Sequence, residues 1–149
     1  MYPFFRPAAF GRHRLRAVLA VPGRSAGGYW LVASDGGILS FADAGFFGWA
    51  ADVPLSKPIV GVATMPSGMG YRLVSTDGGT FAFGDANDLG SLADVPLQFP
   101  IVAMATTRSG RGCLLANSAG GVVDFGDAVF AGSPAGSPLS HPIVAIAVP

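Results

Sequence analysis

The chain has 149 residues with 9 basic and 9 acidic side chains, so its formal net charge is zero. Half of the residues are apolar, only 12% are charged, and 22 glycines and 12 prolines supply many turn positions. This length suits one domain, and the apolar content excludes a disordered chain. A neutral chain also lacks the basic surface that nucleic-acid binding requires. The composition predicts an all-β domain with many short strands and no nucleic-acid partner.

Residues 1–16 form a degenerate basic leader. Its arginines precede a short apolar stretch that superficially resembles a secretion signal. Arg16 interrupts that stretch, which also aligns with a strand of the pattern that follows, so we expect no cleaved signal here. No stretch approaches the roughly 20 apolar residues of a membrane span. A leader of this kind also fits a segment of a longer repeat array.

From about residue 17 onwards the chain repeats with a fixed period of 42 residues. Residues 28–32 return as 70–74 and as 112–116, and a Pro-Ile-Val triplet begins at Pro58, Pro100 and Pro142. A constant period of this size is typical of architectures in which each unit buries its apolar face on the next. We predict a three-repeat module over residues 17–149.

Each unit is predicted to hold four short strands. In the first unit these are residues 29–34, 38–41, 46–48 and 59–64, and a further strand is expected at 143–148. The strands at 29–33 and 58–63 are apolar throughout instead of alternating. This pattern is typical of strands that are covered on both faces.

A tight turn is predicted between the first two strands of each unit. Asp-Gly between apolar runs is the strongest short signal for a hairpin, because the turn needs positive φ angles. The third unit has Ala119 in place of the aspartate but keeps both glycines. The carboxylate is therefore assigned to the turn and not to a ligand. The predicted turn residues are Asp35, Gly36, Gly37, Asp77, Gly78, Gly79, Gly120 and Gly121.

A second turn carries an aspartate in all three units, at Asp43, Asp85 and Asp127. We expect each carboxylate to accept a hydrogen bond from a backbone amide two residues further on. The alternative is a ring of carboxylates that holds a cation or sugar hydroxyls. Calcium needs about six oxygens or more, and one isolated aspartate per unit does not supply them. The sequence therefore predicts no metal site.

The repeat favours the blades of a β-propeller, which are four-stranded and of about this length. A β-trefoil is the alternative, since it also combines three four-stranded repeats, although its strands would alternate more strongly. Three blades are too few to close a ring, because propellers have about four to eight. We therefore expect two chains to form a six-bladed ring as a homodimer, with residues 143–148 completing a blade of the partner.

The first complete unit resembles a known family of repeats. Residues 28–44, with Trp30 in the first strand, and the Pro-Ile-Val-Gly segment that follows are similar to a tryptophan-containing, propeller-like tandem repeat. That repeat occurs in secreted and cell-wall-associated actinobacterial proteins. The later units have Arg72 and Leu114 in place of the tryptophan. The resemblance implies a non-catalytic binding or scaffold module and a secreted or cell-wall-associated location.

The sequence holds no arrangement typical of an enzyme. His13 lies in the leader and His141 precedes Pro142, and neither has a repeated partner acid or nucleophile. Neither a metal-binding cluster nor a phosphate-binding loop is recognisable. Cys113 stands where the other units have tyrosine, which indicates an apolar position of the core. We expect no enzymatic activity, no cofactor and no metal.

Five residues are candidates for ligand binding. Trp30 and Arg72 occupy equivalent strand positions, and Trp49 lies in a loop where an exposed indole can stack on a sugar. Packing of Trp49 under its own loop is the alternative. Asp52 and Asp94 lie in the variable loops, where specificity resides. The expected function is a binding or scaffold surface for glycans or proteins; the alternatives are a carbohydrate-binding trefoil lectin and an enzyme with its site in a central channel.

Overall fold

The computed structural model describes the backbone of residues 15–19 and all atoms of residues 27–149. All regular structure in these residues is β-strand, in three antiparallel sheets of three strands each. The first sheet contains β1 (Leu15–Leu19), β2 (Tyr29–Ala33) and β3 (Ile38–Phe41). The second contains β4 (Ile59–Thr64), β5 (Gly70–Ser75) and β6 (Thr80–Gly84). The third contains β7 (Ile101–Thr106), β8 (Gly112–Asn117) and β9 (Val122–Gly126). The prediction of an all-β chain is confirmed.

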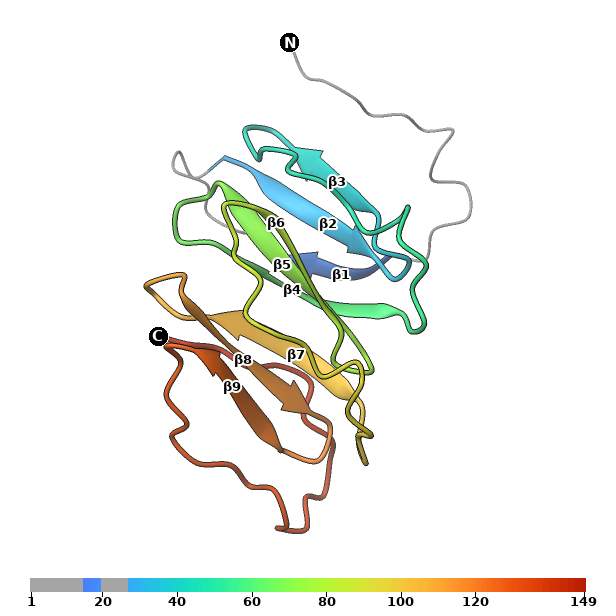
Figure 1. Ribbon diagram of the computed structural model, residues 1–149, viewed down its shortest axis with the longest axis vertical. Helices are drawn as coiled ribbons and strands as arrows, with labels where there is room; N and C mark the ends of the chain where they lie inside the picture. The colour runs from blue at the N-terminus through green and yellow to red at the C-terminus, as the bar shows by residue number, and fades with distance from the viewer. Residues whose placement is uncertain (1–14, 20–26) are drawn as a thin grey trace.

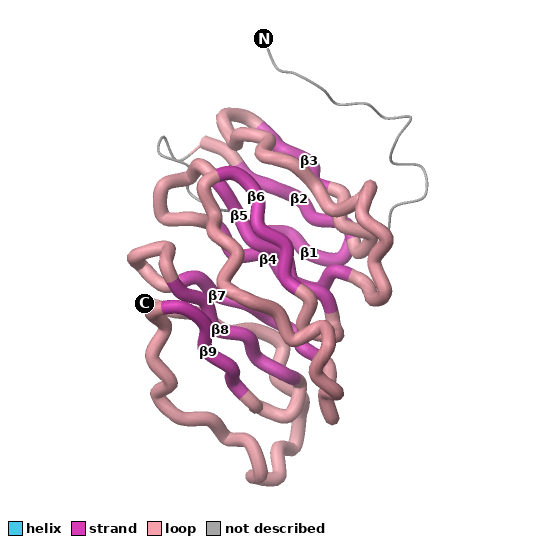
Figure 2. Tube along the Cα trace, viewed as in Figure 1, coloured by secondary structure: helices cyan, strands magenta, loops and turns pink. Residues whose placement is uncertain are grey.

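The three sheets follow one another in chain order along the longest axis of the molecule (Figures 1 and 2). Within each sheet the strands also lie in chain order, and neighbouring strands pair antiparallel. Between strands of different sheets, close backbone contacts involve only the first and middle strands, and the backbones of β3, β6 and β9 come close only to the middle strand of their own sheet. The sheets therefore fan apart from their first strands outwards, and the described residues do not close into a ring.

The strand β1 follows the repeat less closely than β4 and β7 do. Ile59 opposes Ser75 in the second sheet, so the 42-residue period would place Ala17 opposite Ala33. Leu15 occupies that place instead, two residues earlier in the chain. The first sheet therefore begins at Leu15, and its first strand has a register of its own.

Two predicted strands are absent from the described residues. Residues 46–48 are irregular, and the backbone turns at Gly48, whose φ of +127° lies outside the strand region. The segment 143–148 is also irregular, because no neighbouring strand is present to receive its hydrogen bonds. The prediction of four strands per unit is therefore wrong. The segment 143–148 forms no strand within one copy, and its pairing with a partner chain stays a prediction.

The core lies between successive sheets. One cluster, between the first and second sheets, includes Trp30, Tyr71 and Leu73. The other, between the second and third sheets, includes Val74 and Leu115. Every residue of β5 is buried, because the second sheet has a neighbour on each side. This double coverage buries even the polar side chains of Arg72 and Ser75.

A side-chain oxygen holds the turn between β2 and β3 and its equivalent in the second sheet. Asp35 Oδ1 accepts a hydrogen bond from the Gly37 amide at 3.0 Å, and Asp77 Oδ1 accepts one from the Gly79 amide at 3.1 Å. The first glycine of the turn has a positive φ in all three sheets, at Gly36, Gly78 and Gly120. The structure thus places both aspartates within the turn that the Asp-Gly pairs predict.

In the third sheet Asn117 takes over the role of the missing aspartate. Its Oδ1 accepts hydrogen bonds from the amides of Ala119, at 3.0 Å, and Gly121, at 2.7 Å. Replacing Asn117 with alanine is expected to lower the free energy of unfolding by about 1–2 kcal/mol, since two amides lose their acceptor. Urea denaturation measures the change. Asn117→Asp keeps the acceptor oxygen and is the matched control, so an equal loss in both variants would contradict this role.

Candidate functional site

Trp30 and Arg72 are buried at equivalent positions of β2 and β5, with 1% and 2% of their surface exposed. Trp30 Nε1 donates a hydrogen bond to the Gly45 carbonyl at 2.7 Å, and Arg72 Nε donates one to the Asn87 carbonyl at 3.1 Å. Gly45 and Asn87 are themselves equivalent in the repeat. Both side chains therefore tie a middle strand to the loop after the third strand, and neither is exposed to a ligand.

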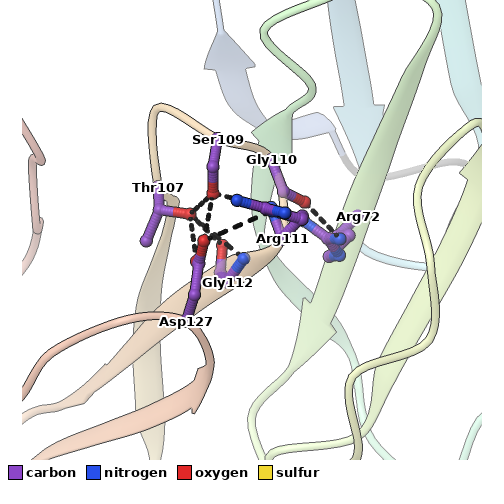
Figure 3. A network of polar contacts seen from close by, with 7 residues as sticks. All are labelled: Arg72, Thr107, Ser109, Gly110, Arg111, Gly112 and Asp127. Carbon is purple, nitrogen blue, oxygen red and sulfur yellow. Dashed lines mark hydrogen bonds and ion pairs between the residues drawn. The ribbon is translucent and has the colours of Figure 1, made fainter.

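Arg72 also reaches the third sheet. One terminal nitrogen donates to the Gly110 carbonyl at 3.0 Å (Figure 3). The other donates to Thr106 Oγ1 at 3.4 Å. Burial lowers the pKa of the Arg72 guanidinium from its usual value, against smaller effects of Cys113 and Asp85 that raise it. An arginine nevertheless stays charged in proteins, so its donors remain available. Arg72 thus links the second and third sheets, a role that the sequence pattern does not reveal.

The aspartate of the second turn is bonded to hydroxyl groups. Asp127 accepts hydrogen bonds from Thr107 Oγ1, at 2.9 Å, and from Ser109 Oγ, and the Arg111 Nε lies 3.7 Å from its carboxylate (Figure 3). The bonds from Ser109 and then Thr107 lower the pKa of Asp127, and Arg111 adds a smaller effect. Asp85 likewise accepts a hydrogen bond from a serine hydroxyl. These carboxylates hold the turn between the first two strands of their sheets.

The predicted bond of this aspartate to an amide two residues further on is not among the hydrogen bonds described for Asp85 or Asp127. The hydroxyl partners come from the preceding turn, 18 residues earlier in the chain for Ser67 and Asp85 and also for Ser109 and Asp127. Ser67 and Ser109 lie one 42-residue period apart, and this recurrence was the sequence signal for the hydroxyl partners of the aspartates.

Trp49 and Asp52 lie together in the loop after the first sheet. Trp49 Nε1 donates to Asp52 Oδ2 at 2.9 Å, and the indole meets the Phe46 ring edge to face with centroids 6.0 Å apart. Trp49 is partly buried against the core, whereas Phe46 is 56% exposed. Asp94 is exposed in the equivalent loop of the second unit, where Ser91 replaces the tryptophan. The structure therefore brings two of the five candidates together and leaves Asp94 apart from them.

Three open clefts recur at the same end of the sheets. Each lies between the turn that joins the middle and third strands and the loop that leads to the next first strand. Their volumes are about 380, 330 and 230 Å³ in chain order. The equivalent lining residues are Ser34, Asp35, Leu55 and Lys57 in the first, Thr76, Asp77, Leu97 and Phe99 in the second, and Ser118, Ala119, Leu139 and His141 in the third.

The three clefts form a continuous row. Lys57 lines both the first and the second cleft, and Phe99 lines both the second and the third. Each cleft combines a leucine with a serine or threonine. An apolar surface with a few hydrogen-bonding groups suits a ligand that has one apolar face and several hydroxyl or amide groups. The row can therefore hold an extended ligand by repeating the same contacts.

The row of clefts was not predicted from the sequence. The residue before each Pro-Ile-Val triplet differs among the units, as Lys57, Phe99 and His141. This variation at one repeat position was the sequence signal for the clefts. Within residues 15–19 and 27–149, no helix is long and apolar enough to cross a membrane, and no group of three or more His, Cys, Asp and Glu side chains is placed to hold a metal ion. No protein-family model matches the chain, and no curated protein matches it.

Proposed function

We propose that this chain is a non-enzymatic repeat module whose row of clefts binds an extended glycan. The recurrence of one cleft in every unit, with the same lining positions, carries this proposal. A polymer of similar sugars offers the same hydroxyl groups and the same apolar ring faces at regular steps, which suits such a row. The resemblance of the first unit to repeats of cell-wall-associated proteins supports a cell-wall glycan as the ligand. A protein partner on the same surface is the alternative.

We also propose that the three sheets are propeller blades and that two chains complete a six-bladed ring. The fan of sheets from their first strands supports this arrangement, because the first strands of propeller blades line the central channel. A trefoil is less favoured, since the three sheets share no strand. No observation in the described residues specifically favours a trefoil lectin or an enzyme with its site in a central channel.

Retention on insoluble cell-wall polysaccharide and titration with soluble oligosaccharides test the binding proposal. Phe99→Ala removes the ring shared by two clefts, and we expect roughly tenfold weaker binding, or about 1.4 kcal/mol. Phe99 is already 41% exposed, so the fold should tolerate the change. Met69→Ala is the matched control, because Met69 is 54% exposed and lines none of the three clefts.

The same titration separates the alternatives. Loss of binding on Trp49→Ala, with Phe99→Ala unaffected, would move the glycan site to the loop that holds Trp49 and Asp52. Absence of retention on every polysaccharide would contradict glycan binding, and capture of a defined protein by the same surface would then favour the scaffold role.

A further inference from the structure

At the interface between the first and second sheets, the aromatic pair Tyr71 and Phe83 contacts the loop 45–48. Tyr71 donates a hydrogen bond to the Gly48 carbonyl and accepts one from the Phe47 amide at 3.2 Å. The Phe83 ring lies 5.8 Å from the Tyr71 ring and faces Gly48, where a Cβ atom would come within 2.7 Å of it. Glycine at position 48 therefore lets the aromatic pair of the second sheet enter the loop of the first.

The loop at the C-terminal end of the stack has the same backbone but no described occupant. The φ angles of the three equivalent glycines are similar, +127° at Gly48, +116° at Gly90 and +113° at Gly132. A Cβ built on Gly90 would lie 3.2 Å from the Phe125 ring, whereas no described atom lies within 4 Å of a Cβ built on Gly132. Phe130, in the same loop, is 52% exposed. The loop 129–132 is therefore an open copy of the internal socket.

The N-terminal end of the stack presents the matching aromatic pair. Tyr29 and Phe41 stand at the positions of Tyr71 and Phe83, and their rings are stacked with centroids 4.9 Å apart. Tyr29 is 40% exposed, whereas Tyr71 is fully buried beneath the loop 45–48. No described loop covers Tyr29 in that way.

The C-terminal segment 143–148 is placed as the first strand of another unit. Its Ile143 amide donates to the Ser118 carbonyl at 2.9 Å, just as the Ile59 amide donates to the Ser34 carbonyl at 2.7 Å. Beyond that bond, the structure describes no backbone–backbone hydrogen bond for residues 144–148. All six residues of the segment are apolar, as is usual for a buried strand. This backbone is therefore ready to pair with a strand from elsewhere.

We propose that the two ends of this stack bind each other head to tail between copies of the chain. The aromatic pair Tyr29 and Phe41 of one copy enters the loop 129–132 of the next, where the Tyr29 hydroxyl contacts the Ala131 amide and the Gly132 carbonyl. These are the repeat equivalents of Phe47 and Gly48. The inference rests on the proposed completion of a ring by two chains and names the surfaces that make it.

The segment 143–148 of one copy pairs with β2 of the next, in the place of β1. The pairing of β4 with β5 sets the register, so Val148 opposes Tyr29 as Thr64 opposes Tyr71. β1 is the replaceable strand, because Arg16 interrupts its apolar sequence and its register departs from the repeat by two residues. An interface between unlike ends closes into a ring when the rotation permits and otherwise extends into a chain of copies.

Light scattering of the full chain across a dilution series tests the interface. The unsubstituted protein should form a concentration-dependent dimer, and Tyr29→Ala should weaken its association roughly 30-fold, the effect of removing a central tyrosine from an interface. Met69→Ala, an exposed position away from both ends, should leave the association unchanged. A dimer that Tyr29→Ala leaves intact would overturn this inference alone. A protein that is monomeric at every concentration would overturn the ring as well, while glycan retention reports on the clefts independently.

Chemical cross-linking distinguishes head-to-tail pairing from an interface between two identical ends of the chain. Tyr29→Cys and Val148→Cys are prepared as separate proteins and treated with a short thiol cross-linker at a concentration high enough to populate the weakened complex. Head-to-tail pairing gives a cross-linked dimer only when the two variants are mixed. Cross-linking of each variant with itself, or none in the mixture, contradicts the pairing. The unsubstituted protein controls for Cys113, which is 1% exposed.

Discussion

Replacement of Tyr71 with alanine is expected to lower the free energy of unfolding by about 4 kcal/mol. Tyr71 is fully buried between the first two sheets, and the rings of Trp30, Phe47 and Phe83 lie within 5.9 Å of its ring centroid. The truncation leaves a cavity there and deprives the Gly48 carbonyl of its donor. Urea denaturation followed by circular dichroism measures the loss. A change below about 1 kcal/mol would mean that this interface contributes little to stability.

Tyr71→Phe keeps the ring and isolates the hydroxyl. Its cost at neutral pH should be about 1–2 kcal/mol. Burial raises the pKa of Tyr71 from 10.0 to about 12, against smaller lowering effects of the hydrogen bonds to Phe47 and Gly48. Above pH 10 the unfolded chain loses the phenolic proton while the folded chain keeps it. The stability that Tyr71 provides is therefore fully present below pH 10 and is lost as the pH rises to about 12, by about 2–3 kcal/mol.

Denaturation curves of the two proteins at a series of alkaline pH values measure this effect. The unsubstituted protein should lose more stability than Tyr71→Phe between pH 10 and 12. Parallel losses in both proteins would assign the alkaline transition to other groups.

Replacement of Arg72 with leucine is expected to cost about 3 kcal/mol of stability. The variant removes the donors that Asn87, Thr106 and Gly110 use, and two of these three acceptors are backbone carbonyls. Leucine is the natural residue at the equivalent position 114, so the strand itself tolerates it. The cost therefore comes from the unpaired carbonyls. Thermal and urea denaturation measure it.

Arg111→Leu is the matched control for this variant. The Arg111 side chain is 79% exposed, and it lies 3.7 Å from Asp127 in a surface ion pair (Figure 3). Pairs of this kind contribute little, so the control should change stability by less than about 1 kcal/mol. Equal effects of the two substitutions would show that the buried position of Arg72 confers no special role.

Local signals in the sequence predicted the local parts of the fold. The Asp-Gly pairs place the hairpin turns, since only a few residue types tolerate the φ angles of that turn. The continuous apolar runs at 29–33 and 58–63 predict strands with both faces covered, and β2 and β4 are buried or half-buried at every position except the exposed Tyr29. The segments 46–48 and 143–148 are apolar too, but a strand also needs a hydrogen-bonding neighbour. Apolar content alone does not supply that information.

The candidate site depends on contacts between distant segments, which sequence patterns record poorly. The Asp35 turn lies beside Lys57 only because the loop between them folds back to the start of the next first strand. Arg72 was a candidate ligand residue because it occupies the strand position equivalent to Trp30. Two of its three partners are the backbone carbonyls of residues 87 and 110, and every residue has such a carbonyl. No residue type therefore marks the partner.

The two internal interfaces differ at the positions where neighbouring units meet, and we expect this difference to favour the correct order of the sheets during folding. Chains of identical repeats are prone to misassembly, in which a unit docks on the wrong neighbour or on another molecule. In this chain Trp30 packs against Tyr71, whereas Arg72, at the equivalent position, lies near the small Cys113. Docking the first sheet directly on the third would leave the Trp30 ring without its aromatic partner and the Arg72 donors without their carbonyls. We therefore expect the residues that differ between the units to favour the correct neighbour during folding.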